Sequence, residues 1–292
     1  MIWKKQSIRH LDLFSGIGGF AYAARTVWGD RYENAGFCDN NWFCQQVLRK
    51  NFPGCKIFSD IRVLADAAGQ GLERSDGQEQ ALALGIGRVD LITGGFPCQP
   101  FSAAGRRRGT IDDRYLWPEM LAVIRRFLPA WVIAENVGGL VTWQQGVVLE
   151  QVCIDLESAG YEVQPFIIPA VSVNAPHRRD RIWFVAHRTG GRRSRGGTEA
   201  KAQERREPQP MLARQLPSRF EGQNSWDREW PQVAAELCGL DDGLPHRMVR
   251  FPDGTATSEA RWRREALKAY GNAIVPQVAM RIMHAIKEAN DR

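Results

Sequence analysis

The chain has 292 residues, of which 43% are hydrophobic, so it can form one large α/β domain with a small appended region. Its formal net charge of +6 suits a polyanionic partner but does not prove one. Because there is no signal peptide, no apolar run of membrane length and no C-x-x-C pair among the six cysteines, we expect a reduced cytoplasmic protein without a membrane or a metal.

The first predicted elements are a strand, a glycine-rich turn and a helix. The strand covers His10–Phe14, the turn covers Ser15–Phe20, and the helix covers Ala21–Trp28. Such a turn lets a ligand approach backbone N–H groups at a helix N-terminus. Its glycines follow a G-x-G-G pattern rather than the dinucleotide fingerprint G-x-G-x-x-G, so a plain tight turn remains an alternative.

Two acidic residues, Asp39 and Asp60, follow the next predicted strands. Asp39 lies 27 residues after Asp12, near the spacing at which a carboxylate on a second strand reaches a ribose. It also precedes the helical stretch Asn41–Asn51, so it could instead cap that helix. Both interpretations stay open at this point.

The most informative segment is Pro97–Ser102, which follows a predicted buried strand, Val89–Thr93. The two prolines restrict the backbone on either side of Cys98, so the loop can hold a thiol in one orientation, as a nucleophile requires. The alternative is an inert cysteine that acts as a small hydrophobic residue.

The alternation of strand and helix patterns from Ser7 to about Ala186 predicts an α/β fold with a doubly wound, mostly parallel sheet. Two later segments, Tyr161–Ile168 and Arg181–Val185, are expected to form strands that pair with each other.

Five blocks, in this order, resemble the DNA (cytosine-5)-methyltransferase family: Asp12–Gly19, Pro97–Ser102, Glu135–Val137, Arg179–Arg181 and Gly271–Pro276. The resemblance runs from about Leu11 to Val278 and lapses over residues 63–87 and 188–264. It implies a Rossmann-like methyltransferase that uses S-adenosylmethionine and carries a small target-recognition domain. The implied domains are residues 1–187 for catalysis and cofactor binding, 188–264 for target recognition, and 265–292 for a segment that returns to the catalytic domain.

The resemblance also implies a mechanism. The thiolate of Cys98 adds to C6 of cytosine, so C5 can attack the methyl group of S-adenosylmethionine, while an acid at N3 neutralises the charge on the ring. The implied catalytic residues are Cys98 as nucleophile, Glu135 at N3, Asn136 supporting that loop, and Arg179 and Arg181 toward the O2 edge. His177 stands where the family usually has Gln, which leaves its role open. Without the family, Glu135 could be a cap and the arginines a solvated cluster.

A cofactor pocket is implied in the same way. Its residues would be Phe14, Gly16, Gly18, Asp39, Trp42, Asp60, Ile61, Pro97, Leu116, Asn272 and Ile274. Asp39 would bind the ribose hydroxyls, and Asp60 and Ile61 would meet the adenine. Because the set ends in the C-terminal block, we expect a helix over Pro276–Asn290 to pack beside the first strand.

Duplex DNA is the implied partner. The residues expected to bind it are Arg106, Arg107 and Arg108 after the cysteine loop, and Arg192, Arg193 and Arg195 in the lapse of resemblance. The stretch 188–223 carries nine Arg or Lys against four Glu and few large apolar residues, so it is either a disordered linker or an arm that contacts phosphates.

Two other functions remain as alternatives: a tRNA cytosine-5 methyltransferase of the same family and a catalytically silent DNA-binding paralogue. The cysteine block ends in Phe101-Ser102 with no Cys-Phe-Thr block after it, which argues against the first. The intact set of Cys98, Glu135 and the turn glycines argues against the second. We expect a monomer, with a cognate restriction endonuclease as a candidate partner.

Overall fold

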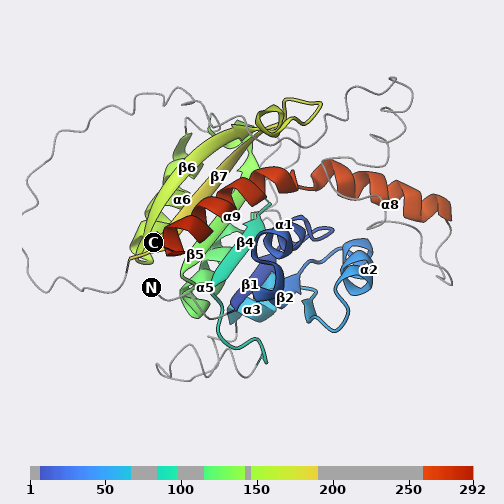
Figure 1. Ribbon diagram of the computed structural model, residues 1–292, viewed down its shortest axis with the longest axis horizontal. Coiled ribbons are helices and arrows are strands. Elements are labelled where there is room, and N and C mark those ends of the chain that lie inside the picture. Colours follow the sequence, from blue (N-terminus) through green and yellow to red (C-terminus); the bar gives the residue numbers. More distant parts are fainter. Residues whose placement is uncertain (1–6, 67–83, 98–114, 142–145, 190–258, 292) are drawn as a thin grey trace, which may run out of the picture. The chain divides into compact units, whose positions relative to one another are not determined.

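The computed structural model describes residues 7–66, 84–97, 115–141, 146–189 and 259–291. These residues contain a seven-stranded sheet in the order β3-β2-β1-β4-β5-β7-β6 (Figure 1). The strands are β1 (Ile8–Leu13), β2 (Tyr32–Cys38), β3 (Ile57–Phe58), β4 (Leu91–Gly95), β5 (Trp131–Val137), β6 (Tyr161–Pro169) and β7 (Asp180–Arg188). The first five strands of this order are parallel, and β7 is antiparallel to both β5 and β6. The predicted doubly wound, mostly parallel sheet and the pairing of the two late strands are confirmed.

The helices are α1 (Gly19–Trp28), α2 (Trp42–Asn51), α3 (Ile61–Asp66), α5 (Trp117–Phe127), α6 (Val147–Ser158), α8 (Glu259–Asn272) and α9 (Pro276–Asp291). Short 3-10 helices cover Gly29–Arg31, Gly138–Val141 and Ala170–Val173. Within the described ranges, every helix is too short or too polar to cross a membrane.

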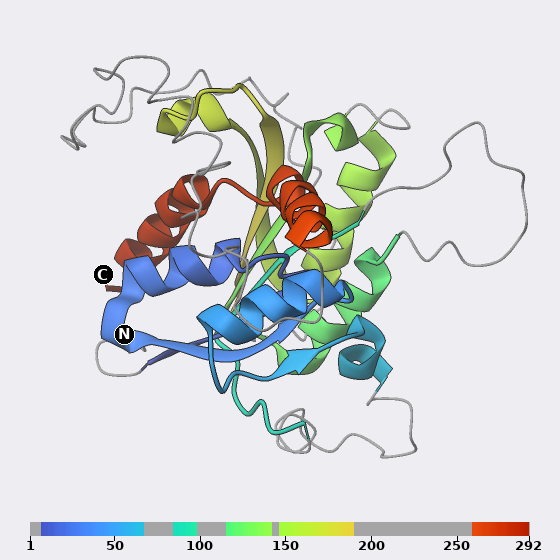
Figure 2. The same ribbon diagram turned by 90° about the vertical axis from the view of Figure 1, so that its right-hand side faces the viewer.

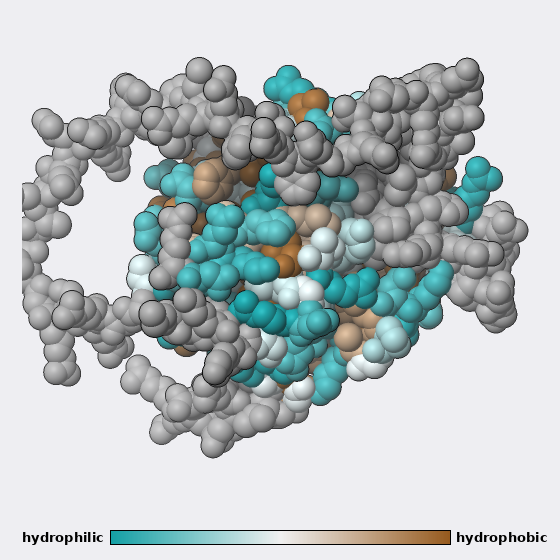
Figure 3. Space-filling model, viewed as in Figure 1, coloured by the Kyte–Doolittle hydropathy of each residue, from teal (hydrophilic) through white to brown (hydrophobic). Residues whose placement is uncertain are grey.

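Helices cover both faces of the sheet, as Figure 2 shows. Side chains alternate along β5: Val132 and Ala134 pack with α5 and α6, whereas Ile133 packs with α1 and α9. Strands that are buried on both faces read as continuous hydrophobic runs, which is why these segments were recognisable from the sequence. Hydrophilic residues predominate on the described surface in Figure 3, with smaller hydrophobic areas between them.

The C-terminal helix α9 packs beside α1 and shares a buried hydrophobic cluster with Ile8 of the first strand. Its observed range, Pro276–Asp291, agrees with the predicted return of the C-terminus. A third hydrophobic cluster joins α8 to α2, where the ring centroids of Trp262 and Phe43 lie 4.5 Å apart. Helix α8 begins at Glu259, so residues 259–264 of the predicted recognition region form its first part. All described residues belong to one compact unit, and the second unit, Gly190–Gly239, lies outside the described part.

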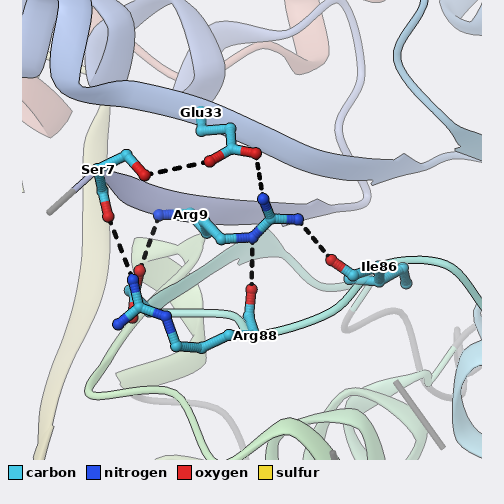
Figure 4. A network of polar contacts seen from close by, with 6 residues as sticks. Ser7, Arg9, Glu33, Ile86 and Arg88 are labelled. Carbon is cyan, nitrogen blue, oxygen red and sulfur yellow. Dashed lines mark hydrogen bonds and ion pairs between the residues drawn. The ribbon is translucent and has the colours of Figure 1, made fainter. Parts of the chain in front are cut away.

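A polar network at the amino ends of the strands fixes the segment that leads into β4 (Figure 4). The guanidinium of Arg9 on β1 donates to the carbonyls of Ile86, at 2.6 Å, and Arg88, at 2.9 Å, and it also pairs with Glu33 of β2. Arg88 in turn donates to the Ser7 carbonyl at 3.3 Å. Ligands of open α/β sheets bind at the carboxyl ends of the strands. This network lies at the opposite, amino ends, so we assign it to the stability of the fold and not to ligand binding.

Candidate active site

The carboxyl ends of the central strands meet at one edge of the sheet. The chain order reverses between β1 and β4, and this reversal is the point where doubly wound folds bind ligands. The glycine turn follows β1, Asp39 follows β2, Pro97 follows β4, and Glu135 lies near the end of β5. The sheet therefore brings three of the predicted blocks and Asp39 to the same edge.

The glycine turn has a backbone that few residue types can adopt. Phe14, Gly16 and Gly18 have φ angles of 50°, 55° and 88°, and α1 has no side-chain cap at Gly18. A Cβ on Gly18 would lie 2.9 Å from the Phe52 ring, so space as well as dihedral angle requires glycine there. Ser15 fixes the turn to the end of β2, because its N–H donates to the Cys38 carbonyl at 3.0 Å. The result is a rigid turn with main-chain N–H groups at a helix N-terminus.

Asp39 is joined to this turn. Its carboxylate accepts the N–H of Gly16 at 2.7 Å and the N–H of Asn41 at 2.8 Å. Burial raises the pKa of Asp39, and these two N–H groups oppose the rise. The cap of α2 is Asn41, whose side chain accepts from Phe43 at 2.8 Å and from Cys44 at 3.4 Å. Asp39 therefore does not cap α2, and its carboxylate links the ends of β1 and β2.

Three more residues predicted to contact the cofactor, Asp60, Ile61 and Trp42, have partners of their own in the fold. Asp60 accepts the N–H of Arg62 at 2.9 Å in the first turn of α3, next to the buried side chain of Ile61. Trp42 makes an edge contact with Trp262 of α8 at 6.2 Å between ring centroids. The predicted stacking residue is thus packed against the C-terminal part of the chain.

A buried polar network inside the sheet was not predicted from the sequence. Thr93 of β4 donates to the Asp12 carboxylate at 2.8 Å, and His10 Nε2 lies 2.7 Å from the same hydroxyl. While the Thr93 hydroxyl donates to Asp12, the Nε2 atom of His10 can act only as the donor in its bond to Thr93. Burial lowers the pKa of His10 to about 3 and raises that of Asp12 well above its usual range. The only sequence signal was polar residues inside hydrophobic strands, which does not reveal their partners.

Glu135 is a buried carboxyl group that faces a cation. Its Oε1 accepts from Arg181 Nε at 2.9 Å, and a Cβ on Gly95, its neighbour on β4, would lie 3.1 Å from its Oε2. Burial raises the pKa of Glu135 to about 7, although Arg181 and Arg179 act in the opposite direction. The group therefore changes its protonation near neutral pH, which suits an acid catalyst.

Asn136, the next residue, fixes the backbone before the cysteine loop. Its side-chain Nδ2 donates to the Phe96 carbonyl at 2.9 Å, and its side-chain Oδ1 accepts the N–H of Val137 at 2.8 Å. Beyond Phe96, the Pro97 carbonyl lies 3.5 Å from the N–H of Leu116. Pro97 and Leu116, which flank the segment that contains Cys98, therefore lie next to each other.

Several predicted residues lie outside the described part of the chain, and the structure gives no account of them. They are Cys98, Arg106, Arg107, Arg108, Arg192, Arg193 and Arg195. In the described ranges, no three His, Cys, Asp or Glu side chains are grouped as metal ligands would be.

The C-terminal block returns to the glycine turn. A Cβ on Gly19 would lie 2.8 Å from Ile274 Cγ1, and the side chain of Ile274 is buried with α1. Asn272 is exposed at the end of α8. Arg179, which we expected beside Arg181 at the O2 edge, donates to main-chain carbonyls in this block.

Comparisons with known proteins agree with this arrangement. The family model for C-5 cytosine-specific DNA methylases matches residues 8–231. The type II methyltransferase M.HpaII of Haemophilus parainfluenzae is 31% identical over 191 residues, which cover 64% of this chain and 48% of the relative. M.AquIA of Picosynechococcus is 30% identical over 190 residues, with coverages of 62% and 72%.

The Dnmt2 methyltransferase of S. pombe has the same fold, with a TM-score of 0.60 at 19% identity over 98% of this chain and 100% of that one. The matched region spans about half the length of most of the curated relatives. The family match covers well over half of the chain and includes the turn, the cysteine loop and the Glu135 block. The chain therefore belongs to the C-5 cytosine-specific DNA methylase family.

Proposed function

We propose that this protein transfers a methyl group from S-adenosylmethionine to C5 of a flipped cytosine in duplex DNA, through a covalent bond between Cys98 Sγ and C6. The observation that carries the proposal is Glu135: a buried carboxyl group with a pKa of about 7, held by Arg181 where β4 and β5 end. The family supplies the reaction class, and this geometry supplies an acid at the required edge of the sheet.

The residues around the glycine turn fit S-adenosylmethionine, which supplies an electrophilic methyl group when bound. The turn of Phe14, Gly16 and Gly18 presents the N-terminus of α1, whose N–H groups we assign to the methionine carboxylate, because the N–H groups of Gly16 and Gly18 already donate to Asp39 and Ser15. Asp39 holds a carboxylate at the end of β2, and each of its oxygens, which accepts one N–H, retains acceptor capacity for a ribose hydroxyl. We assign the adenine side to Asp60 and Ile61, with Pro97, Leu116, Trp42, Asn272 and Ile274 around the pocket.

At the base, Cys98 adds to C6 and the ring gains negative charge. Glu135, when protonated, donates to N3 and neutralises that charge. Arg181 orients the Glu135 carboxyl group and offers a cation to the O2 edge. Asn136 holds the backbone that leads into the Cys98 loop. C5 then attacks the methyl group. Loss of the C5 proton to a base lets Cys98 Sγ leave C6 by elimination, which restores the aromatic ring with the methyl group on C5.

The basic residues 106–108 and those at 192, 193 and 195 are proposed to contact DNA phosphates, with target choice in residues 188–264. We further propose a cytoplasmic monomer that protects DNA from a cognate restriction endonuclease. The restriction-modification role is supported by the relatives, which are named type II methyltransferases.

Methyl transfer from labelled S-adenosylmethionine tests the substrate. We expect label in duplex DNA and none in tRNA; label in tRNA alone would support the RNA alternative, and label in neither would support a silent paralogue. Duplex DNA prepared with 5-fluorocytosine at every cytosine tests the mechanism without knowledge of the target sequence. Because elimination needs a C5 proton, the wild type should stay covalently attached in denaturing gels, and the variant Cys98→Ser should not.

A further inference from the structure

The side chain of Arg179 binds two residues that follow it by 92 and 94 positions in the sequence. Its Nη2 donates to the Gly271 carbonyl at 2.9 Å and to the Ala273 carbonyl at 2.8 Å. One guanidinium nitrogen has two hydrogens, so both are used on the end of α8 and on the link to α9. These bonds from a charged donor are stronger than bonds between neutral groups.

The same side chain lies near the proposed target-base site. Arg179 contributes to the electrostatic environment of Glu135, while Arg181 pairs with that carboxylate directly. The φ angle of Arg179 is +35°, which residues other than glycine adopt only when their surroundings hold them there. The two carbonyl bonds are part of those surroundings.

The link that Arg179 holds also contacts the glycine turn. Ile274 directly follows Ala273, and its side chain packs on Gly19 so closely that a Cβ there would lie 2.8 Å from Ile274 Cγ1. Contacts therefore run from Arg179 through Ala273 to Ile274 and Gly19, while Arg179 acts on Glu135 through its charge. Helix α9, which begins two residues after Ile274, packs beside α1 (Figure 1).

We propose that Arg179 is a positioning residue that couples the cofactor pocket to the target-base site by holding the α8–α9 link against the glycine turn. The proposal rests on the proposed function, because it names the cofactor and base sites defined there. While the link is held, the turn keeps the backbone that receives the cofactor, and the Arg179 charge stays beside Glu135. Such coupling is reciprocal, so a change at the link affects both sites.

The test compares Arg179→Gln with Arg179→Lys and with the control Arg178→Gln. The Arg178 side chain is 83% exposed and forms an ion pair with Asp180 on the surface. Calorimetry measures binding of S-adenosylhomocysteine to the chain without DNA. Amide hydrogen exchange follows peptides that contain residues 16–22 and 271–276. Steady-state assays on DNA without cytosine methylation give KM for S-adenosylmethionine, kcat and the pH profile of kcat.

For Arg179→Gln we expect about tenfold weaker binding of S-adenosylhomocysteine, an increase in exchange of about tenfold in both peptides, and a pH profile of kcat displaced toward higher pH. Arg179→Lys should recover part of the binding, because it keeps a charged donor without the planar fork. Arg178→Gln should match the wild type. If Arg179→Gln does not fold, the same measurements on Arg179→Lys decide.

Unchanged binding in Arg179→Gln would overturn the proposal, even if exchange rises at the link alone. A merely structural role would raise exchange without moving the pH profile, and that result would also overturn it. If the wild type binds S-adenosylhomocysteine but methylates no DNA, the proposed function fails. The binding and exchange measurements on the Arg179 variants then still test whether the link holds the glycine turn. If the wild type binds no S-adenosylhomocysteine, both proposals fail.

Discussion

The buried carboxyl group of Glu135 makes the stability of the protein depend on pH in a predictable direction. Its pKa rises from 4.5 to about 7 on folding, because burial disfavours the charged form more than Arg181 and Arg179 favour it. The folded state therefore binds the proton more tightly than the unfolded state. The resulting stabilisation is complete below pH 4.5 and is lost as the pH rises through about 7.

The substitution Glu135→Gln removes this titration. Each pH unit between the two pKa values corresponds to about 1.4 kcal/mol. The free energy of unfolding of the wild type should therefore fall relative to that of Glu135→Gln by about 3 kcal/mol between pH 4.5 and pH 8. Only 8% of Glu135 is exposed, so screening by solvent reduces this value little.

Urea unfolding at several pH values between 4.5 and 8 measures the difference directly. The control is Glu150→Gln, which changes an exposed carboxylate on α6 and should follow the wild type at every pH. Parallel stability curves for the wild type and Glu135→Gln would contradict this prediction, because they would mean that Glu135 titrates alike in the folded and unfolded states.

Three further predictions concern the fold and the cofactor pocket. Gly18→Ala should cost about 1–3 kcal/mol more than Gly16→Ala in urea unfolding, because both add a Cβ at positive φ but only Gly18 would place it 2.9 Å from the Phe52 ring; equal losses would contradict the steric argument. Arg9→Ala should lower the free energy of unfolding by about 1–3 kcal/mol with KM for S-adenosylmethionine unchanged, and a raised KM would contradict its placement away from the site. Asp39→Ala should weaken S-adenosylhomocysteine binding by about 1–3 kcal/mol in calorimetry, and unchanged affinity would leave Asp39 only a link between strands.

The sequence was sufficient to predict the architecture because each signal was local. Hydrophobic strands buried on both faces, turns marked by glycine and a helix with one apolar face are visible in short windows, and they gave the sheet and the C-terminal helix α9. The antiparallel pair of β6 and β7 was visible as two neighbouring strand patterns. Strand β3 was harder to delimit, since only Ile57 and Phe58 pair with β2.

Parts of the site that depend on long-range geometry were not predictable. The contact between Thr93 and Asp12 follows from the register of β1 on β4, which pairs residues 81 positions apart. The choice between Asp39 and Asn41 as the cap of α2 depends on dihedral angles that composition does not fix. Arg179 was assigned to the base because it neighbours Arg181, but its side chain reaches carbonyls more than ninety residues away.

Bisulfite sequencing of DNA from cells that express the wild type or Cys98→Ser shows whether this protein methylates cytosine at C5 through Cys98. We predict cytosines that resist conversion within one recurring sequence in cells with the wild type, and none in cells with Cys98→Ser. Complete conversion in cells with the wild type, or the same resistant cytosines with Cys98→Ser, would contradict C5 methylation through this cysteine.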